Sequence, residues 1–96
     1  MMIIALAVAL PLFAAAQSSG TTRTVEGKTF QLRMGVWVDP EYNSITMADD
    51  LRTIRYLSGE YLHLMERHPG ILPYLALGQR LILVHKGEAI AIMPGH

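Results

Sequence analysis

Residues 56–84, YLSGEYLHLMERHPGILPYLALGQRLILV, decide the fold of this 96-residue chain. Serine is a good N-cap, so Ser58 predicts a helix that begins at Gly59. The residue before a proline avoids the helical region, so Pro69 ends that helix near Arg67. The first part of the stretch therefore predicts one helix with a defined start and a defined end.

The same proline can open a second short helix, because the first helical position needs no backbone N–H. We expect this helix over residues 70–77. Gly78 follows it and suits the left-handed conformation in which helices often end. The sequence thus predicts a helical segment that is broken at proline.

An apolar run, residues 81–84, comes next and carries apolar side chains on both faces. Such a run is typical of a central strand that is covered on each side. Lys86-Gly87 predicts a tight turn, and residues 89–93 return with alternating small and large side chains. This pattern predicts a terminal β-hairpin.

Before residue 40, apolar residues alternate with a period of two, which is typical of half-buried strands. Two dipeptides that end in glycine, Glu26-Gly27 and Met34-Gly35, supply the positive φ angles that tight hairpin turns need. The pattern predicts a three-stranded meander with strands at residues 23–25, 28–33 and 36–39.

Residues 39–50 contain Pro40, which lacks an N–H for a strand ladder, and we expect a surface loop there. Residues 51–56 fit two structures. Their alternation with a period of two fits a strand. They also fit a helix that starts at Met47. That helix would carry Gly59 in its middle, where glycine destabilises a helix by about 1 kcal/mol relative to alanine. The strand is favoured.

Together these elements predict an α+β fold. An antiparallel β-meander and a C-terminal β-hairpin pack against the proline-broken helical segment. We expect this small domain to span residues 23–96, after a flexible mature N-terminus at residues 17–22.

The first sixteen residues, MMIIALAVALPLFAAA, are uncharged and end in three alanines. An apolar core followed by an A-x-A site is typical of a secretory signal, so we expect cleavage near Ala16 and export to the periplasm or beyond. The alternative is an uncleaved membrane anchor. The run is shorter than the roughly 20 residues of a membrane span, and Pro11 interrupts it, so the signal is favoured.

Eight basic and eight acidic residues cancel, and neither sign forms a run, so a surface for nucleic acid is not expected. The chain has no cysteine, which excludes disulfide bonds and a thiol nucleophile. No serine lies in a G-x-S-x-G motif. We therefore expect a protein that is not an enzyme and holds no cofactor.

Two segments, residues 27–42 (GKTFQLRMGVWVDPEY) and residues 56–84, carry a resemblance to a known group of proteins. They resemble the C-terminal module of bacterial exported proteins with vault-protein-inter-α-trypsin and von Willebrand factor A-type domains. The matching positions are Gly27, Lys28, Thr29, Phe30, Trp37, Val38, Asp39, Tyr42, His68, Pro69 and residues 74–78. The resemblance implies a β-rich module without a catalytic role, and it favours a strand at residues 51–56.

The chain contains neither of these two domains. It also lacks the D-x-S-x-S metal motif of the A-type domain, so the resemblance does not imply metal-dependent adhesion.

A metal site is the sharpest chemical alternative. Glu60 and His63 lie three residues apart and would share one helix face, at a spacing used by carboxylate–histidine metal ligands. They are weak candidates, and solvated helix side chains are the favoured interpretation. A second ligand pair would have to come from His85, Asp39 or His96, and sequence spacing alone cannot bring these residues together.

Trp37, Tyr42 and Tyr61 are candidates for an exposed recognition patch, because aromatic side chains anchor interfaces. The favoured alternative is that they cover the core. The function expected from the sequence is a non-catalytic exported interaction or accessory module of the cell envelope or periplasm, with a protein partner or self-association. The alternative function is a small metal-binding protein that uses Glu60 and His63.

Overall fold

The computed structural model describes residues 21–95. The expected signal at residues 1–16, with its alternative as an anchor, lies outside the described residues, as do residues 17–20 of the expected flexible N-terminus. The first strand begins at Thr22, so the last residue of that expected flexible segment belongs to the sheet. No helix between residues 21 and 95 is long and apolar enough to cross a membrane.

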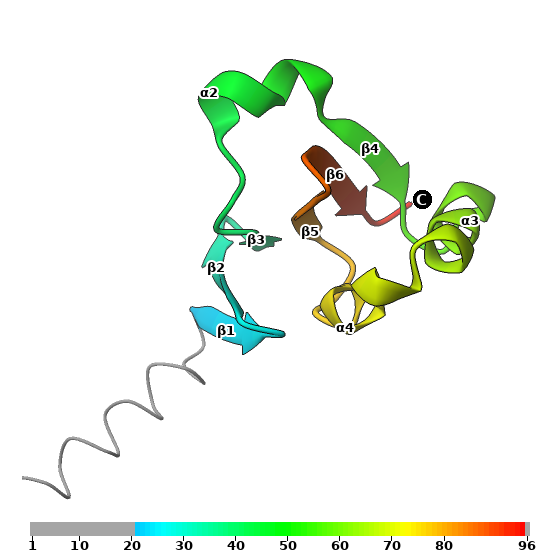
Figure 1. Cartoon of the computed structure of the whole chain (residues 1–96), viewed down its shortest axis with the longest axis horizontal. Coiled ribbons are helices and arrows are strands. Elements are labelled where there is room, and N and C mark those ends of the chain that lie inside the picture. The colour runs from blue at the N-terminus through cyan, green and yellow to red at the C-terminus, as the bar shows by residue number, and fades with distance from the viewer. Residues whose placement is uncertain (1–20, 96) are drawn as a thin grey trace, which may run out of the picture.

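Within this range the strands form a six-stranded sheet in the order β1-β2-β3-β5-β6-β4. The helical elements are short and connect successive strands of the chain, β3 to β4 and β4 to β5 (Figure 1). The elements are, in order, β1 (Thr22–Val25), β2 (Lys28–Arg33), β3 (Val36–Val38), α2 (Ser44–Met47), the 3-10 helix η1 (Ala48–Asp50), β4 (Arg52–Arg55), α3 (Gly59–Arg67), the 3-10 helix η2 (Pro69–Ile71), α4 (Leu72–Leu75), β5 (Leu81–His85) and β6 (Glu88–Met93). This arrangement confirms the α+β class.

The sheet joins the predicted meander to the predicted hairpin. β1, β2 and β3 pair antiparallel, and so do β5 and β6. β3 pairs parallel with β5, and β4 pairs parallel with β6 at the sheet edge. The sheet is therefore mixed, and each parallel pairing brings together segments that are distant in the sequence.

All three hairpins turn through a residue with positive φ followed by a glycine with positive φ. This is the backbone of a type I′ turn, whose twist matches that of the flanking strands. The φ angles are +48° and +83° at Glu26-Gly27, +52° and +82° at Met34-Gly35, and +52° and +81° at Lys86-Gly87. The three turns that the sequence predicts are confirmed.

Helix α3 has the predicted bounds. The Ser58 side chain accepts a hydrogen bond from the backbone N–H of Tyr61 at 3.2 Å, which satisfies one of the unpaired donors at the helix start. Pro69 opens the next helical piece, η2, as predicted. The second helix is shorter than predicted. η2 and α4 together end at Leu75, and residues 76–77 form a turn. Gly78 has a φ of +145°.

The loop predicted over residues 39–50 is wrong in its second half, which forms α2 and η1. The Asn43 side chain starts α2 by accepting hydrogen bonds from the backbone N–H groups of Ile45 (2.9 Å) and Thr46 (3.3 Å). Helix α2 has no buried residue, so it carries no apolar stripe by which a sequence pattern could reveal it. The strand at residues 51–56 is confirmed as β4, with Ile54 fully buried.

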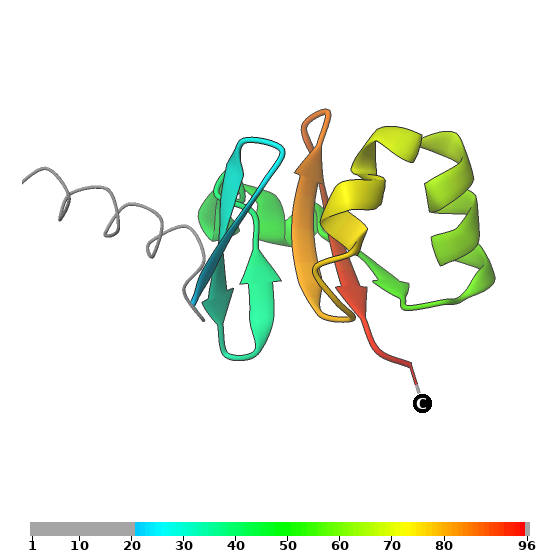
Figure 2. The ribbon, with the colours of Figure 1, turned by 90° about the horizontal axis from the view of Figure 1, so that it is seen from below.

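The main core lies between one face of the sheet and the helices α3 and α4. In Figure 2, α4 lies in front of β5 and β6, and α3 lies farther out, where it contacts β4. Alternate residues of the strands point into this core, as the two-residue period of a strand requires. The buried core residues are Phe30, Ile54, Tyr61, Leu64, Ile71, Leu75, Leu81, Leu83, Ile90 and Ile92.

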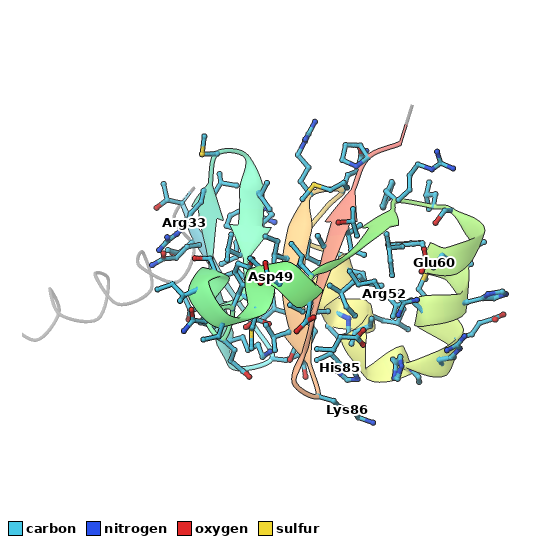
Figure 3. All side chains as sticks on the ribbon, turned by 90° about the horizontal axis from the view of Figure 1, so that it is seen from above. Arg33, Asp49, Arg52, Glu60, His85 and Lys86 are labelled. Carbon is cyan, nitrogen blue, oxygen red and sulfur yellow. The ribbon has the colours of Figure 1, made fainter. Side chains whose placement is uncertain are left out.

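The opposite face of the sheet is covered at its centre by α2 and η1, which cross in front of the strands in Figure 3. η1 contacts β6, and Val84, Ala89 and Ala91 are buried on this side. The small alanine side chains suit this close cover. β5 is thus covered on both faces, as its apolar sequence predicts.

Candidate functional site

A polar cleft of about 400 Å³ opens on the face of the sheet that carries α2. It lies between the β2–β3 hairpin and the chain that leaves β3. Its lining residues are Thr29, Gln31, Arg33, Val38, Asp39, Pro40, Tyr42 and Ser44. Six of these eight side chains carry polar groups that can form hydrogen bonds, so the cleft suits a polar ligand.

The cleft is formed by the alternation of side chains along β2 and by the turn of the chain at Pro40. Alternation along β2 places Thr29, Gln31 and Arg33 on the same face, away from the core side of Phe30. Pro40 cannot continue the ladder after β3, so the chain turns away from the sheet there. This turn brings Tyr42 to the cleft.

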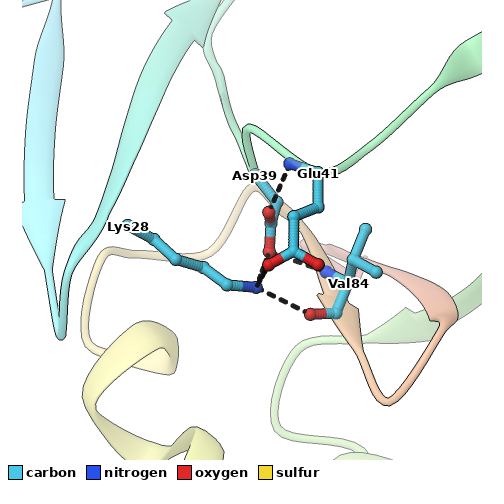
Figure 4. Close-up of polar contacts among 4 residues, drawn as sticks. All are labelled: Lys28, Asp39, Glu41 and Val84. Atoms are coloured by element: carbon cyan, nitrogen blue, oxygen red, sulfur yellow. Dashed lines mark hydrogen bonds and ion pairs between the residues drawn. The ribbon is translucent and has the colours of Figure 1, made fainter.

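Asp39 forms the inner wall of the cleft and is buried, with 1% of its surface exposed. Its Oδ2 accepts hydrogen bonds from Lys28 Nζ at 2.7 Å and from the backbone N–H of Val84 at 2.9 Å. Its Oδ1 accepts one from the backbone N–H of Glu41 at 2.8 Å (Figure 4). These donors satisfy the buried carboxylate, which would otherwise be costly to bury.

Lys28 completes this cluster. Its Nζ donates to the backbone oxygen of Val84 at 2.9 Å and lies 3.1 Å from Glu41 Oε2 and 5.5 Å from the ring centre of Tyr74. Partial burial lowers the pKa of Lys28, but its hydrogen bonds and charge attraction to Asp39 and Glu41 outweigh burial, and the net pKa lies above the usual 10.5. Lys28 therefore remains a cation at neutral pH.

Arg33 lies at the outer side of the cleft, on the part of the sheet where Figure 3 labels it. Its Nε and Nη2 both donate to Oε1 of Gln31, at 3.2 and 2.7 Å. These two bonds orient the flat guanidinium group and occupy one of its edges. Within residues 21–95, Arg33 forms no ion pair with a carboxylate.

The three aromatic residues predicted as a recognition patch lie in different places. Tyr42 lines the cleft. Trp37 is half-buried against the core, with the Arg23 guanidinium 5.3 Å from its ring centre. Tyr61 is a core residue with 5% of its surface exposed, so it cannot belong to an exposed patch. Burial, and to a lesser degree Tyr56, raises the pKa of Tyr61.

The two predicted metal candidates, Glu60 and His63, line a second cleft of about 430 Å³ beside α3. Glu60 Oε2 already accepts hydrogen bonds from Arg52, at 2.8 Å from Nη2 and 3.1 Å from Nε, and Figure 3 labels both residues. His63 is exposed. Among the described residues, no three His, Cys, Asp or Glu side chains gather closely enough to hold a metal ion.

Two histidines lie side by side, although their spacing in the sequence does not predict a pair. The rings of His68, at the end of α3, and His85, at the end of β5, lie with their centres 5.0 Å apart. Burial lowers the pKa of His85, and the nearby His68, Lys86 and Lys28 lower it further, while Glu88 raises it. The fold brings these histidines together, so no local motif could reveal the pair.

Comparison of the chain with protein-family models, with curated proteins and with solved structures found no match.

Proposed function

We propose that this chain is a non-catalytic interaction module, exported to the cell envelope or periplasm, that binds a protein partner through the cleft beside Arg33. Export is supported by the uncharged apolar run that ends at Ala16. The resemblance of residues 27–42 and 56–84 to a terminal module of exported proteins supports the same role.

The oriented guanidinium of Arg33 is the observation that carries this proposal. Gln31 fixes its plane through two hydrogen bonds, and the remaining N–H groups have no carboxylate partner among the described residues. A fixed guanidinium binds a carboxylate through two parallel hydrogen bonds at a small entropic cost. The partner is therefore expected to present an acidic side chain or a chain terminus.

The other groups of the cleft fit the same partner. The Gln31 amide oxygen is used by Arg33, so its NH₂ group can donate to a ligand. Tyr42 and Ser44 add hydroxyl donors. Asp39 faces the interior and is held by three donors, which suits a structural carboxylate.

Site-specific crosslinking tests the proposal. A photo-reactive residue replaces Tyr42 in the exported chain, and a matched chain carries it at exposed His63 on the opposite face of the sheet. We expect a crosslink to one envelope protein from position 42, which excess unlabelled chain suppresses and which Arg33→Glu abolishes. An adduct of two copies of this chain would identify self-association. A crosslink that Arg33→Glu leaves unchanged, or that appears equally from position 63, would contradict the role of the cleft.

A further inference from the structure

The second cleft, beside α3, gathers basic side chains from a helix and from a strand. Glu60, His63 and Arg67 are three or four residues apart in sequence along α3, so they share one face of that helix. Arg52 reaches the same cleft from β4. With the histidines neutral, two arginines and one glutamate give the lining a charge of +1, in a chain whose net charge is zero. The lining residues are Arg52, Gly59, Glu60, His63, Leu64, Arg67 and His68.

Arg67 brings an unpaired guanidinium to this α3 cleft. Its side chain is exposed and forms no hydrogen bond or ion pair with any other residue between 21 and 95. His63, one turn before it, and His68, directly after it, line the same cleft. An imidazole ring carries at least one N–H donor in either protonation state. The α3 side of the cleft therefore offers several donors and a full positive charge.

Arg52 supplies further donors from the other side. Glu60 Oε2 accepts from its Nε at 3.1 Å and from its Nη2 at 2.8 Å, which fixes the plane of the guanidinium (Figure 3). Its Nη1 lies 3.9 Å from Glu88, too far for a hydrogen bond. A guanidinium has five N–H donors, so the two bonds to Glu60 leave three of them for a ligand.

We propose that the α3 cleft binds the phosphate group of a small phosphate monoester or of a lipid headgroup. One guanidinium satisfies a carboxylate, whereas a phosphate monoester presents three acceptor oxygens and a charge of about −1.5 to −2 at pH 7. Two arginines on opposite sides of a cleft match the larger charge. The cleft volume of about 430 Å³ lies within the range of small-molecule sites. This site is independent of the partner cleft beside Arg33, which lies on the other face of the sheet.

Titration of the tag-free exported chain with inorganic phosphate, at constant ionic strength, tests this proposal. In NMR spectra, the backbone amide signals of Gly59, His63 and Arg67 should shift together with one half-saturation concentration. Arg67→Gln should raise that concentration about tenfold, since it removes a charge-assisted hydrogen bond. Arg80→Gln removes the same charge from an exposed residue outside the cleft and should leave it almost unchanged. Equal losses in these two variants would overturn the site.

Glu60→Gln should have the opposite effect. The glutamine amide oxygen still accepts from Arg52, but the negative charge that repels phosphate is gone, so the half-saturation concentration should fall about threefold. Glu66→Gln removes the same charge from an exposed residue of α3 outside the cleft and should have little effect. Weaker phosphate binding in Glu60→Gln, or an equal gain in Glu66→Gln, would overturn the proposal.

Two further probes distinguish the sources of the phosphate group. Glycerol phosphate that shifts the same signals, without binding of the chain to vesicles, identifies a soluble monoester. Sedimentation with phosphatidylcholine vesicles only when they contain phosphatidic acid, and its loss in Arg67→Gln, identifies a lipid headgroup. If inorganic phosphate and both probes leave the signals of the α3 cleft unshifted, or shift only those around Arg33, the proposal is wrong.

Discussion

Lys28 and Asp39, whose side chains lie 2.7 Å apart, together bind both backbone polar groups of Val84. β3 ends at Val38, and the last backbone bond of that junction runs from the N–H of Asp39 to the oxygen of Ile82 at 2.9 Å. Beyond this point β5 continues without a neighbouring β3 strand. The Lys28 ammonium and the Asp39 carboxylate thus take the positions where the next strand residues would pair.

Removing the negative charge of Asp39 should therefore weaken the join between β3 and β5. In Asp39→Asn, an amide replaces a buried carboxylate that accepts from two backbone N–H groups and Lys28. Breaking one partner of a buried pair costs about 3 kcal/mol or more of unfolding free energy. Urea unfolding, followed by the fluorescence of Trp37, should show a loss of this size.

Asp49→Asn is the matched control, since Asp49 is exposed, and surface changes of this kind stay within about 0.5 kcal/mol. Lys28→Met and the double variant complete a double-mutant cycle. The sum of the losses of unfolding free energy in the two single variants should exceed the loss in the double variant. Simple additivity would show that Lys28 and Asp39 do not act together.

Local signals predicted most of the elements of this fold. Ser58 and Pro69 mark the helix ends because capping and proline geometry act within a few residues. The glycines of the three hairpin turns mark strand ends for the same reason. The strand order and the two parallel pairings depend on contacts between distant segments, such as Trp37 with Leu81, and no local pattern encodes them.

The candidate sites show the same limit. Tyr42 was predicted as an interaction residue and lines the cleft, while Tyr61 was also predicted and is buried in the core. Composition cannot separate these two tyrosines, because only the fold decides which one meets solvent. The histidine pair is not predicted, because His68 and His85 become neighbours only in the folded chain. Arg33 is not singled out, because its alternation with Gln31 along β2 is the ordinary pattern of an exposed strand face.

The stability of the domain should fall when His85 becomes protonated. Burial and the neighbouring His68, Lys86 and Lys28 hold the pKa of His85 below its ordinary value of 6.5, whereas Glu88 acts in the opposite direction. The unfolded chain then binds the proton more readily than the folded chain. Neutral His85 therefore makes its full contribution to the free energy of unfolding above about pH 6.5. This contribution is lost as the pH falls through the lowered pKa of His85 in the folded state.

Urea unfolding in metal-free buffer between about pH 7.5 and pH 5.5 measures this dependence. The pH dependence should become shallower in His85→Gln. His63→Gln is the control, since His63 is exposed, and it should keep the wild-type slope. A slope in His85→Gln equal to that of the wild type would contradict the assignment.

Two glycine-to-alanine changes should have opposite effects. Gly87 has a φ of +81°, which strains any L side chain, so Gly87→Ala should destabilise the domain by about 1 kcal/mol. Gly59 begins α3 without a positive φ, and an added Cβ meets nothing within 4 Å. Gly59→Ala should stabilise the domain by about 0.5 kcal/mol, because it lowers the entropy of the unfolded chain. Urea midpoints that shift in the same direction would contradict this difference.

Leu57 joins β4 to α3 in an unfavourable backbone conformation. It has a φ of +63° although it is a leucine, and 63% of its surface is exposed, so little burial offsets the strain. Asparagine tolerates this left-handed conformation far better. Leu57→Asn should therefore raise the free energy of unfolding by about 0.5 to 1 kcal/mol.

The same substitution at Leu62 is the matched control for Leu57→Asn. Leu62 is also exposed but lies within α3, where asparagine is a poorer helix former than leucine, so Leu62→Asn should lower stability by about 0.5 kcal/mol. Urea unfolding of both variants gives the comparison. If Leu57→Asn also lowers stability, its backbone conformation is not a source of strain, and the leucine side chain contributes packing that its exposure conceals.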